Sequence, residues 1–313
     1  MVGFRSNRVL IADPITDEAI QILRRGVHVI VMAEISYDEF VSQIPGYEAV
    51  IVKGRMRVDK EVIERGAKLK VIGRCGMGMD KIDLEAAAER GIIVVNSGPG
   101  SASSVAELTI GHMISLSRSL PSADLSVRRG KWARKKFEGR ELKGKTLGII
   151  GCGRIGSKVA MLGKAFGMGV IVYDPYAQSP PPFVLVKDVK DLCRRSDYVS
   201  VHVPLTDKTR HLIDEKSIKE MKPSAYLINC ARGGIIDERA LYNALKNGEI
   251  AGAALDVFEQ EPPGETPLLE LERIVFTPHL GGITKEGQKR TARIIAEQVL
   301  KALKGEELEY RVR

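Results

Sequence analysis

With 313 residues, of which 44% are hydrophobic, the chain has room for two domains that each bury a core. No apolar run approaches the ~20 residues of a membrane span, and residues 1–7 lack the apolar stretch of a signal peptide, so we expect a cytoplasmic protein without membrane contact. The formal net charge of +8 suits an anionic cofactor and substrate, or simply solubility, and does not by itself indicate a nucleic acid.

Apolar strands alternate with amphipathic helices over the first 96 residues. The predicted strands are residues 9–13, 27–32, 47–52, 69–74 and 92–96, and the predicted helices lie near residues 17–25, 37–44, 60–65 and 84–90. Strands joined by crossover helices predict a parallel, doubly wound sheet. Such sheets bind ligands at the carboxyl ends of their strands, where loops 53–57 and 74–78 follow the third and fourth strands.

A linker of small residues, NSGPGSASS at 96–104, follows the fifth strand. Residues 105–120 are largely apolar and predict one long helix. We therefore expect a domain boundary near residue 98.

The next segment, residues 128–145, is strongly basic, with nine Lys or Arg residues against two Glu. Basic runs are usually solvated surfaces, but this one contains Phe137 and the only tryptophan, Trp132. Aromatic side chains and Arg are enriched in the cores of interfaces. We expect a contact between the subunits of a homodimer, with a free surface flap as the alternative.

Residues 146–174, TLGIIGCGRIGSKVAMLGKAFGMGVIVYD, predict an apolar strand, a glycine-rich turn, a helix and a second strand that ends in a carboxylate. This is the order of the dinucleotide-binding fingerprint. Gly151 permits the tight turn, Gly153 lets the backbone approach a pyrophosphate, and Gly156 lets the helix pack closely on the sheet. The helix N-terminus offers N–H groups and a positive dipole end to the phosphates.

Asp174 follows Gly151 by 23 residues, at the end of the second strand. A carboxylate there can accept hydrogen bonds from both ribose hydroxyls. Pro175 and Tyr176 follow it, with no nearby Arg to bind a 2′-phosphate. The segment therefore predicts an NAD site rather than an NADP site, with an ordinary loop as the alternative.

The alternation of strands and helices continues to the end of the chain. The predicted helices lie near residues 189–195, 216–221, 238–246 and 284–303, and the predicted strands are residues 198–203, 225–230, 251–257 and 273–279. With the strands of the fingerprint they make a second parallel sheet of six or more strands. We therefore predict an α/β protein with two doubly wound parallel-sheet (Rossmann-like) domains, the cofactor domain inserted into the substrate domain. The substrate domain comprises residues 1–98 and 284–313, and the NAD-binding domain comprises residues 99–283.

Cys75, Cys152, Cys193 and Cys230 lie far apart, with no C-x-x-C pair and no histidine cluster. This spacing argues against a disulfide framework and against a zinc site, so we expect reduced thiols and no metal.

Three strand ends of the second sheet carry candidates for chemistry. Oxidation of a hydroxy acid by NAD needs a base for the hydroxyl proton, a group that holds the base, and a cation that orients the carboxylate. His279 is the expected base, because imidazole titrates near neutrality. Glu261 is the expected partner, since a nearby carboxylate favours the imidazolium. Arg232 offers a planar fork of donors to the substrate.

Each of these residues also has an ordinary structural interpretation. His279 can simply close a strand, Glu261 can belong to a surface turn, and Arg232 can pair with a neighbouring acid. The other histidines are not grouped with such candidate residues. We interpret His28 and His112 as structural, and His202 and His211 as loop residues near the cofactor.

The motifs CARGG, ALDVF-x-x-EPP and PHLGG follow the glycine-rich turn in this order. Together they resemble the D-isomer-specific 2-hydroxyacid dehydrogenase family over nearly the whole chain. Residues 75–87 and 130–156 look most like the members that oxidise D-3-phosphoglycerate to 3-phosphohydroxypyruvate for serine synthesis, and the resemblance implies that reaction here.

The resemblance also implies site residues. The catalytic residues are Arg232, Glu261 and His279. The cofactor-binding residues are Gly151, Gly153, Arg154, Ile155 and Gly156 at the pyrophosphate, Asp174 at the adenosine ribose, Val203, and Cys230, Ala231, Arg232, Asp256, His279, Gly281 and Gly282 around the nicotinamide half. The substrate-binding residues are Lys53, Arg74, Gly76, Met77, Gly78 and, from a partner subunit, Arg134.

Two positions depart from the family pattern, which commonly has Arg where this chain has Lys53 and Thr where it has Met77. Lysine keeps the charge but loses the bidentate geometry of arginine. A glyoxylate or hydroxypyruvate reductase is therefore an alternative, and an NAD-sensing binding protein such as a corepressor is another. Because the sequence ends soon after the last predicted helix, we expect no serine-sensing domain and no control by serine through one.

Overall fold

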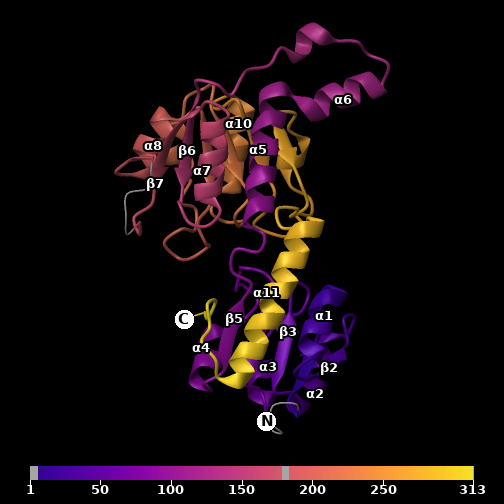
Figure 1. Cartoon of the computed structure of the whole chain (residues 1–313). Helices are drawn as coiled ribbons and strands as arrows, with labels where there is room; N and C mark the ends of the chain where they lie inside the picture. Colours follow the sequence, from indigo (N-terminus) through magenta and orange to yellow (C-terminus); the bar gives the residue numbers. More distant parts are fainter. Residues whose placement is uncertain (1–5, 178–182, 313) are drawn as a thin grey trace. The chain divides into compact units, whose positions relative to one another are not determined.

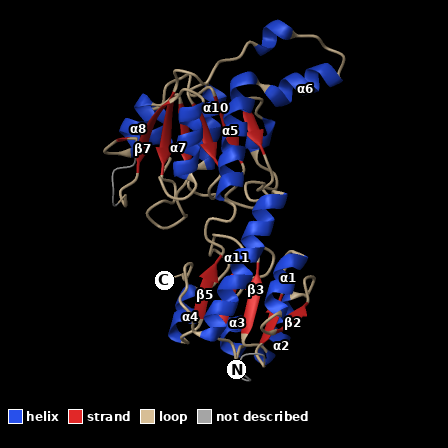
Figure 2. Ribbon diagram, viewed as in Figure 1, coloured by secondary structure: helices blue, strands red, loops and turns tan. Residues whose placement is uncertain are grey.

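The computed structural model describes residues 6–177 and 183–312. The chain divides into two compact units, Met1–Ser101 with Thr284–Arg313 and Ala102–Ile283. Each unit contains one parallel sheet with helices on both faces (Figures 1 and 2). The predicted α/β fold with two doubly wound parallel sheets is confirmed. Within the described residues, none of the helices combines the length and the apolar character needed to span a bilayer.

The first unit has a five-stranded sheet in the order β2-β1-β3-β4-β5. Its strands are β1 (Arg8–Ile11), β2 (His28–Val31), β3 (Ala49–Val52), β4 (Val71–Arg74) and β5 (Ile93–Asn96). Its helices are α1 (Asp17–Arg24), α2 (Tyr37–Gln43), η1 (Ile44–Gly46), α3 (Lys60–Arg65), α4 (Leu84–Glu89) and α11 (Lys285–Lys304).

The middle strand of this sheet, β3, is apolar and buried at every position because both of its faces are covered. In β3, Val50 packs in the cluster that contains Phe40 of α2, whereas Ile51 packs with Ile295 of α11. Figure 1 shows α11 lying along the sheet of this unit. The Thr284 side chain caps this helix by accepting from Gly287 N at 2.9 Å. The last helix is thus part of the first unit, although it follows the second in sequence.

The second unit has a seven-stranded sheet in the order β12-β11-β10-β9-β6-β7-β8. Its strands are β6 (Thr146–Ile150), β7 (Gly169–Tyr173), β8 (Val184–Leu185), β9 (Tyr198–Val201), β10 (Tyr226–Asn229), β11 (Gly252–Leu255) and β12 (Ile274–Phe276). Its helices are α5 (Ala102–Arg118), α6 (Leu120–Arg128), η2 (Arg134–Phe137), α7 (Gly156–Ala165), α8 (Val189–Arg195), α9 (Glu215–Lys219), α10 (Glu238–Asn247) and η3 (Pro267–Glu270).

Strand β6, the first of this sheet in sequence, pairs with β7 on one side and with β9 on the other. The strand order therefore reverses beside β6. Ligands of such sheets bind at the carboxyl ends of the strands next to the reversal, so we expect a ligand at the loop that follows β6. Side chains of β6 alternate between two cores: Ile149 packs with Met113 of α5 and Val159 of α7, and Ile150 packs with Leu192 of α8.

The long helix predicted at residues 105–120 is present as α5, which ends two residues earlier than predicted, whereas the helix that follows it, α6, was not predicted. Helix α5 ends at Arg118, Ser119 adopts a left-handed conformation with φ of 50°, and Pro121 occupies the first turn of α6. A left-handed residue ends a helix, and proline is tolerated in the first turn of the next. Figure 1 shows α6 extending from the body of the second unit, and this helix buries none of its residues. The short edge strand β8 was not predicted either.

Candidate active site

The glycine-rich turn connects β6 to α7 and has almost no room for side chains. Gly151 adopts φ of 88°, and a Cβ there would lie 2.7 Å from Val203 Cγ1 and 2.8 Å from His202 O. A Cβ at Gly156 would overlap the carbonyl oxygen of Gly151. Both glycines are therefore required by the close packing of the turn against β9 and α7.

Gly153 differs from its neighbours because a Cβ there would meet no atom within 4 Å. The space beside this backbone is open, and the first turn of α7 follows it with N–H groups that have no partner within the helix. Gly153 and the exposed Arg154 thus border a surface that fits a pyrophosphate, whereas Ile155 occupies the position before the helix.

Asp174 lies at the carboxyl end of β7, and its carboxylate closes the turn. Its Oδ2 accepts from Cys152 N at 2.8 Å and its Oδ1 accepts from Tyr176 N at 2.9 Å. An ionised carboxylate has about four acceptor sites, so each oxygen retains capacity for another hydrogen bond. The geometry fits a ribose diol beside the glycine-rich turn.

His279 and Glu261 form a hydrogen-bonded pair near the ends of β12 and β11. His279 Nδ1 lies 2.7 Å from Glu261 Oε2, and Phe258 N donates to Glu261 Oε1 at 3.3 Å. The side chains are 49% and 39% exposed, so both remain accessible to a ligand. Because Nδ1 is engaged by the carboxylate, Nε2 is the ring nitrogen that can exchange a proton with a bound molecule.

The buried carboxylate of Asp256 builds the turn that carries His279. Its Oδ1 accepts from Thr277 Oγ1 at 2.5 Å and from Leu280 N at 2.7 Å, and its Oδ2 accepts from Gly281 N at 2.8 Å. His279 N donates to the Asp256 carbonyl at 2.8 Å, and His279 has φ of 53°. Left-handed backbone is uncommon outside glycine, so these hydrogen bonds hold His279 in a conformation that few residues adopt. Gly282 follows in the same loop.

Arg232 lies in the loop after β10, which Asn229 organises. Asn229 Oδ1 accepts from Ala231 N at 3.0 Å, and Asn229 Nδ2 donates to Arg232 O at 2.8 Å. Arg232 Nη1 donates to Ala231 O at 2.7 Å, which directs the guanidinium along the loop. Burial raises the pKa of the Cys230 thiol to about 12, so this cysteine is protonated at neutral pH and is no nucleophile.

The predicted substrate residues of the first unit follow β3 and β4. Lys53 Nζ donates to Gln288 Oε1 of α11 at 3.1 Å, and Asp13 Oδ2 accepts from Lys53 N at 2.6 Å. Arg74 Nη1 donates to Cys75 O at 2.9 Å, and a Cβ at Gly76 would lie 2.6 Å from that nitrogen. Within the described residues, the backbone N–H groups of Met77 and Gly78 donate to no protein acceptor.

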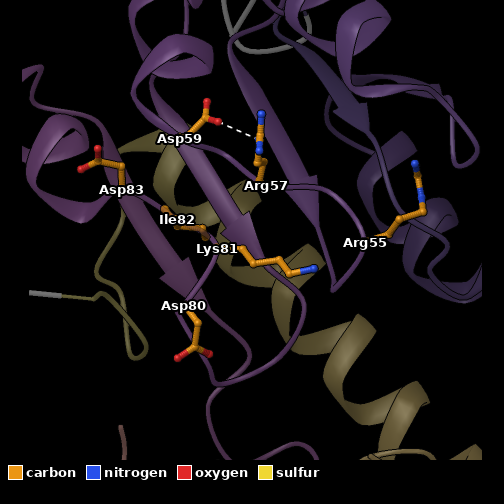
Figure 3. Close-up of a pocket in the computed structure, with 7 residues that line it drawn as sticks. All are labelled: Arg55, Arg57, Asp59, Asp80, Lys81, Ile82 and Asp83. Atoms are coloured by element: carbon orange, nitrogen blue, oxygen red, sulfur yellow. Dashed lines mark ion pairs between the residues drawn. The ribbon is translucent and has the colours of Figure 1, made fainter. Parts of the chain in front are cut away.

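A surface hollow of about 530 Å³ also lies in the first unit (Figure 3). The lining residues are Arg55, Arg57, Asp59, Asp80, Lys81, Ile82 and Asp83. Its cations are paired: Arg57 Nε lies 2.8 Å from Asp59 Oδ2, and Lys81 Nζ donates to Gly54 O at 2.6 Å. None of the predicted site residues lines this hollow, and its lining offers nearly balanced charge to a ligand.

The other histidines and the basic segment lie in different surroundings. His28 is exposed on β2, and burial lowers the pKa of His202 to about 3, with Ser200 Oγ 2.8 Å from its Nε2. His211 Nε2 lies 3.1 Å from Glu259 Oε1, and His112 is buried beside Thr277. Arg134 is exposed in η2.

Three residues that shape these loops were missed by the sequence analysis: Asp13, Asn229 and Thr277. Each is a polar residue at or just after a strand end, and this position is the signal that the sequence offered. The described part of the chain contains no group of three His, Cys, Asp or Glu side chains that could hold a metal ion.

The family model described as D-isomer specific 2-hydroxyacid dehydrogenase, NAD binding domain, matches residues 110–281, which confirms NAD as the predicted cofactor. The chain is 50% identical over 303 residues to D-3-phosphoglycerate dehydrogenase of Methanocaldococcus jannaschii, covering 96% of this chain and 58% of that protein. It is 43% identical to hydroxypyruvate reductase of Thermotoga maritima, covering 95% and 98%.

The crystal structure of the TT0316 protein from Thermus thermophilus has the same fold, with a TM-score of 0.90 and 34% identity over 98% of this chain and 100% of that one. The chain thus spans little more than half of the phosphoglycerate dehydrogenase that it matches, but the full length of shorter relatives. These similarities confirm the resemblance inferred from the motifs, and the chain belongs to the D-isomer specific 2-hydroxyacid dehydrogenase family.

Proposed function

We propose that the chain is an NAD-dependent dehydrogenase that oxidises D-3-phosphoglycerate to 3-phosphohydroxypyruvate, a step leading into serine synthesis, and that also catalyses the reverse reduction. The observation that carries the reaction type is the pair of His279 and Glu261, 2.7 Å apart in the NAD-binding unit. The name and 50% identity of the Methanocaldococcus jannaschii relative support the choice of substrate.

In this proposal, His279 Nε2 takes the proton of the substrate hydroxyl, and Glu261 stabilises the imidazolium that forms. The chemistry that bound NAD supplies is acceptance of a hydride from the carbon that bears the hydroxyl. As the C–H and O–H bonds break, a C=O bond forms, so the product is the 2-oxo acid. Arg232 holds the substrate carboxylate and the oxygen that becomes the carbonyl.

Anionic groups of the substrate are assigned to the first unit. In the loop Gly76-Met77-Gly78, the N–H groups of Met77 and Gly78 bind the carboxylate, because that of Gly76 donates to Arg74 O. Lys53 and Arg74 bind the phosphate. Cation-to-phosphate hydrogen bonds are among the stronger polar contacts in proteins.

For the cofactor, we assign Gly151, Gly153, Arg154, Ile155 and Gly156 to the pyrophosphate. The Asp174 carboxylate binds the ribose. The nicotinamide half is assigned to the residues Val203, Cys230, Ala231, Asp256, Gly281 and Gly282. The substrate domain comprises residues 1–98 and 284–313, and the NAD-binding domain residues 99–283.

We also propose a homodimer held together by α6 and the segment that leads to η2. Leu120, Leu125, Val127 and Trp132 are 47%, 44%, 57% and 79% exposed, and their apolar surface is large for one short helix and its flank. In the dimer, Arg134 reaches the substrate site of the partner. Sedimentation of the protein as a monomer at micromolar concentration contradicts this part. The four unpaired cysteines favour a cytoplasmic location.

A second candidate is reduction of hydroxypyruvate. The Thermotoga maritima relative of that name is covered over 98% of its length by this chain, whereas the Methanocaldococcus jannaschii relative is covered over 58%. The two candidates share the chemistry of His279 and differ in the group that the first unit binds.

Kinetics of an Arg74→Ala variant distinguish the two candidates. If Arg74 binds the phosphate, the KM for 3-phosphohydroxypyruvate rises by about tenfold or more, because a charge-assisted hydrogen bond is lost, while the KM for hydroxypyruvate changes little. Arg65→Ala is the matched control, since Arg65 pairs with Glu61 on the exposed surface of α3. Equal losses on both substrates favour the reductase.

A further inference from the structure

A series of hydrogen-bonded polar side chains connects helix α5 to the turn that carries His279. His112 lies on the buried side of α5 and is 2% exposed, and its Nε2 lies 3.1 Å from Thr277 Oγ1. Thr277 Oγ1 is in turn 2.5 Å from Asp256 Oδ1, and the Asp256 carboxylate accepts from Leu280 N and Gly281 N. All of these residues belong to the second unit.

The number of protons that His112, Thr277 and Asp256 share determines which atom donates in each of their hydrogen bonds. Asp256 Oδ1 accepts from Leu280 N as well as from Thr277 Oγ1, so the single hydroxyl proton of Thr277 points to Asp256. Thr277 Oγ1 can then only accept from His112, which places a proton on His112 Nε2. Burial lowers the pKa of His112, against a smaller opposite influence of Asp256, so the ring is neutral and carries that one proton.

The turn depends on this arrangement because its central carboxylate is 1% exposed and its described hydrogen bonds come from neutral donors. A buried carboxylate is destabilised when any of its hydrogen-bond donors is lost. If His112 held its proton on Nδ1, its Nε2 would compete with Asp256 for the Thr277 proton. His279 sits between Thr277 and Leu280 with φ of 53°, so a weaker turn allows His279 to relax towards ordinary backbone.

We propose that His112 is a positioning residue for His279: it fixes the Thr277 hydroxyl on Asp256 and thereby holds the left-handed turn that presents the base. This role rests on the proposed dehydrogenase function and refines our interpretation of His112 as merely structural. It requires no contact of His112 with substrate or cofactor.

The test combines amide hydrogen exchange with kinetics. In His112→Leu, which keeps the apolar character of α5, exchange of the peptide that covers residues 277–283 accelerates by about fivefold, the usual effect of one lost hydrogen bond, and kcat falls by about three- to tenfold. The KM for the oxo acid stays within about twofold, because the residues assigned to its carboxylate lie on other loops. His112→Gln, which restores an Nε2 donor, recovers part of kcat.

Ser117→Ala is the matched control. Ser117 also lies buried on α5, but its hydroxyl contacts Tyr198 OH at 2.6 Å and Met113 O, away from the turn. This variant loses a buried hydrogen bond from the same helix and leaves exchange at residues 277–283 unchanged. Equal acceleration in His112→Leu and Ser117→Ala identifies a general loss of stability and overturns the proposal.

A double-mutant cycle with Thr277→Val isolates the route. If His112 acts through Thr277, adding His112→Leu to Thr277→Val changes neither exchange nor kcat further. Independent effects of the two substitutions, or wild-type exchange in a folded His112→Leu protein, overturn the proposal. If His112→Leu does not fold, the pair Thr277→Ser and Thr277→Val replaces it. We then expect wild-type exchange of residues 277–283 in Thr277→Ser and faster exchange in Thr277→Val. Equal exchange in these two variants overturns the proposal. Exchange is measured without substrate, so it stays informative even when the wild type lacks the proposed activity.

Discussion

In the glycine-rich turn, we expect opposite effects on folding stability from alanine substitutions at Gly153 and Gly156, which are only three residues apart. A methyl group at Gly156 overlaps Gly151 O and lies 3.0 Å from Gly151 C and 3.2 Å from Ile149 Cγ2. Helix α7 must therefore move away from β6, which costs about 1–3 kcal/mol of folding free energy, as overpacking usually does. A methyl group at Gly153 meets nothing within 4 Å, and the backbone there is compatible with alanine. Gly153→Ala should leave stability unchanged or raise it by about 0.4–1 kcal/mol.

The NADH affinity of the Gly153→Ala variant distinguishes a pyrophosphate-binding turn from an ordinary loop. The Gly153 methyl fills the space that the pyrophosphate needs, so the Kd for NADH should rise by about 5- to 150-fold, equivalent to about 1–3 kcal/mol of steric cost. Calorimetric titration with NADH and denaturant unfolding measure the two quantities. Gly111→Ala is the control, since Gly111 lies in α5 with open space around it and far in sequence from the turn. Wild-type NADH affinity in Gly153→Ala refutes the assignment of the turn to the pyrophosphate.

Three further predictions concern single side chains. His279→Ala should lower kcat by about 10²- to 10⁴-fold while NADH still binds, since a general acid and base is lost; near wild-type turnover removes His279 from the mechanism. Asp174→Ala should weaken NADH binding by about 1.5–3 kcal/mol through loss of a charged acceptor, and unchanged affinity in calorimetry excludes it from the ribose site. Burial of Asp197 is outweighed by hydrogen bonds from Thr146 N and Lys222 Nζ, so its pKa is lowered. Its stabilising contribution is therefore present above the unfolded value of about 3.9 and is lost as the pH falls through the lower folded value. Asp197→Asn should destabilise the protein by about 1–3 kcal/mol at pH 7 and progressively less below about pH 4; a difference that does not shrink on acidification contradicts this reasoning.

The parallel sheets could be predicted because their strands are short apolar runs covered on both faces. The β3 sequence AVIV is buried at every position, and no other element of that length explains such a pattern. The glycine-rich turn could be predicted for a different reason: close backbone approaches demand glycine, as at Gly151 and Gly156. Asp174 could be placed at a strand end because the apolar run of β7 stops before it.

The arrangement inside the loops could not be predicted, since it depends on partners distant in sequence. Nothing near Thr277 indicates that its hydroxyl lies between His112 and Asp256, 165 and 21 residues away. The left-handed conformation of Ser119 could not be predicted from its residue type, because serine is no typical residue for that conformation, whereas Pro121 does mark the start of a new helix. Propensity and periodicity describe elements, whereas buried hydrogen bonds between loops are set by the tertiary structure.

We propose that this chain oxidises and reduces a phosphorylated 2-hydroxy and 2-oxo acid pair with NAD. The most direct test of this proposal is the kcat/KM of the wild-type protein for 3-phosphohydroxypyruvate, hydroxypyruvate and glyoxylate, each with NADH and with NADPH. We expect the largest value for 3-phosphohydroxypyruvate with NADH, at least about tenfold above the unphosphorylated acids, the factor that one charge-assisted hydrogen bond supplies. A larger value for hydroxypyruvate or glyoxylate, a preference for NADPH, or no turnover of any of the three acids would contradict the account.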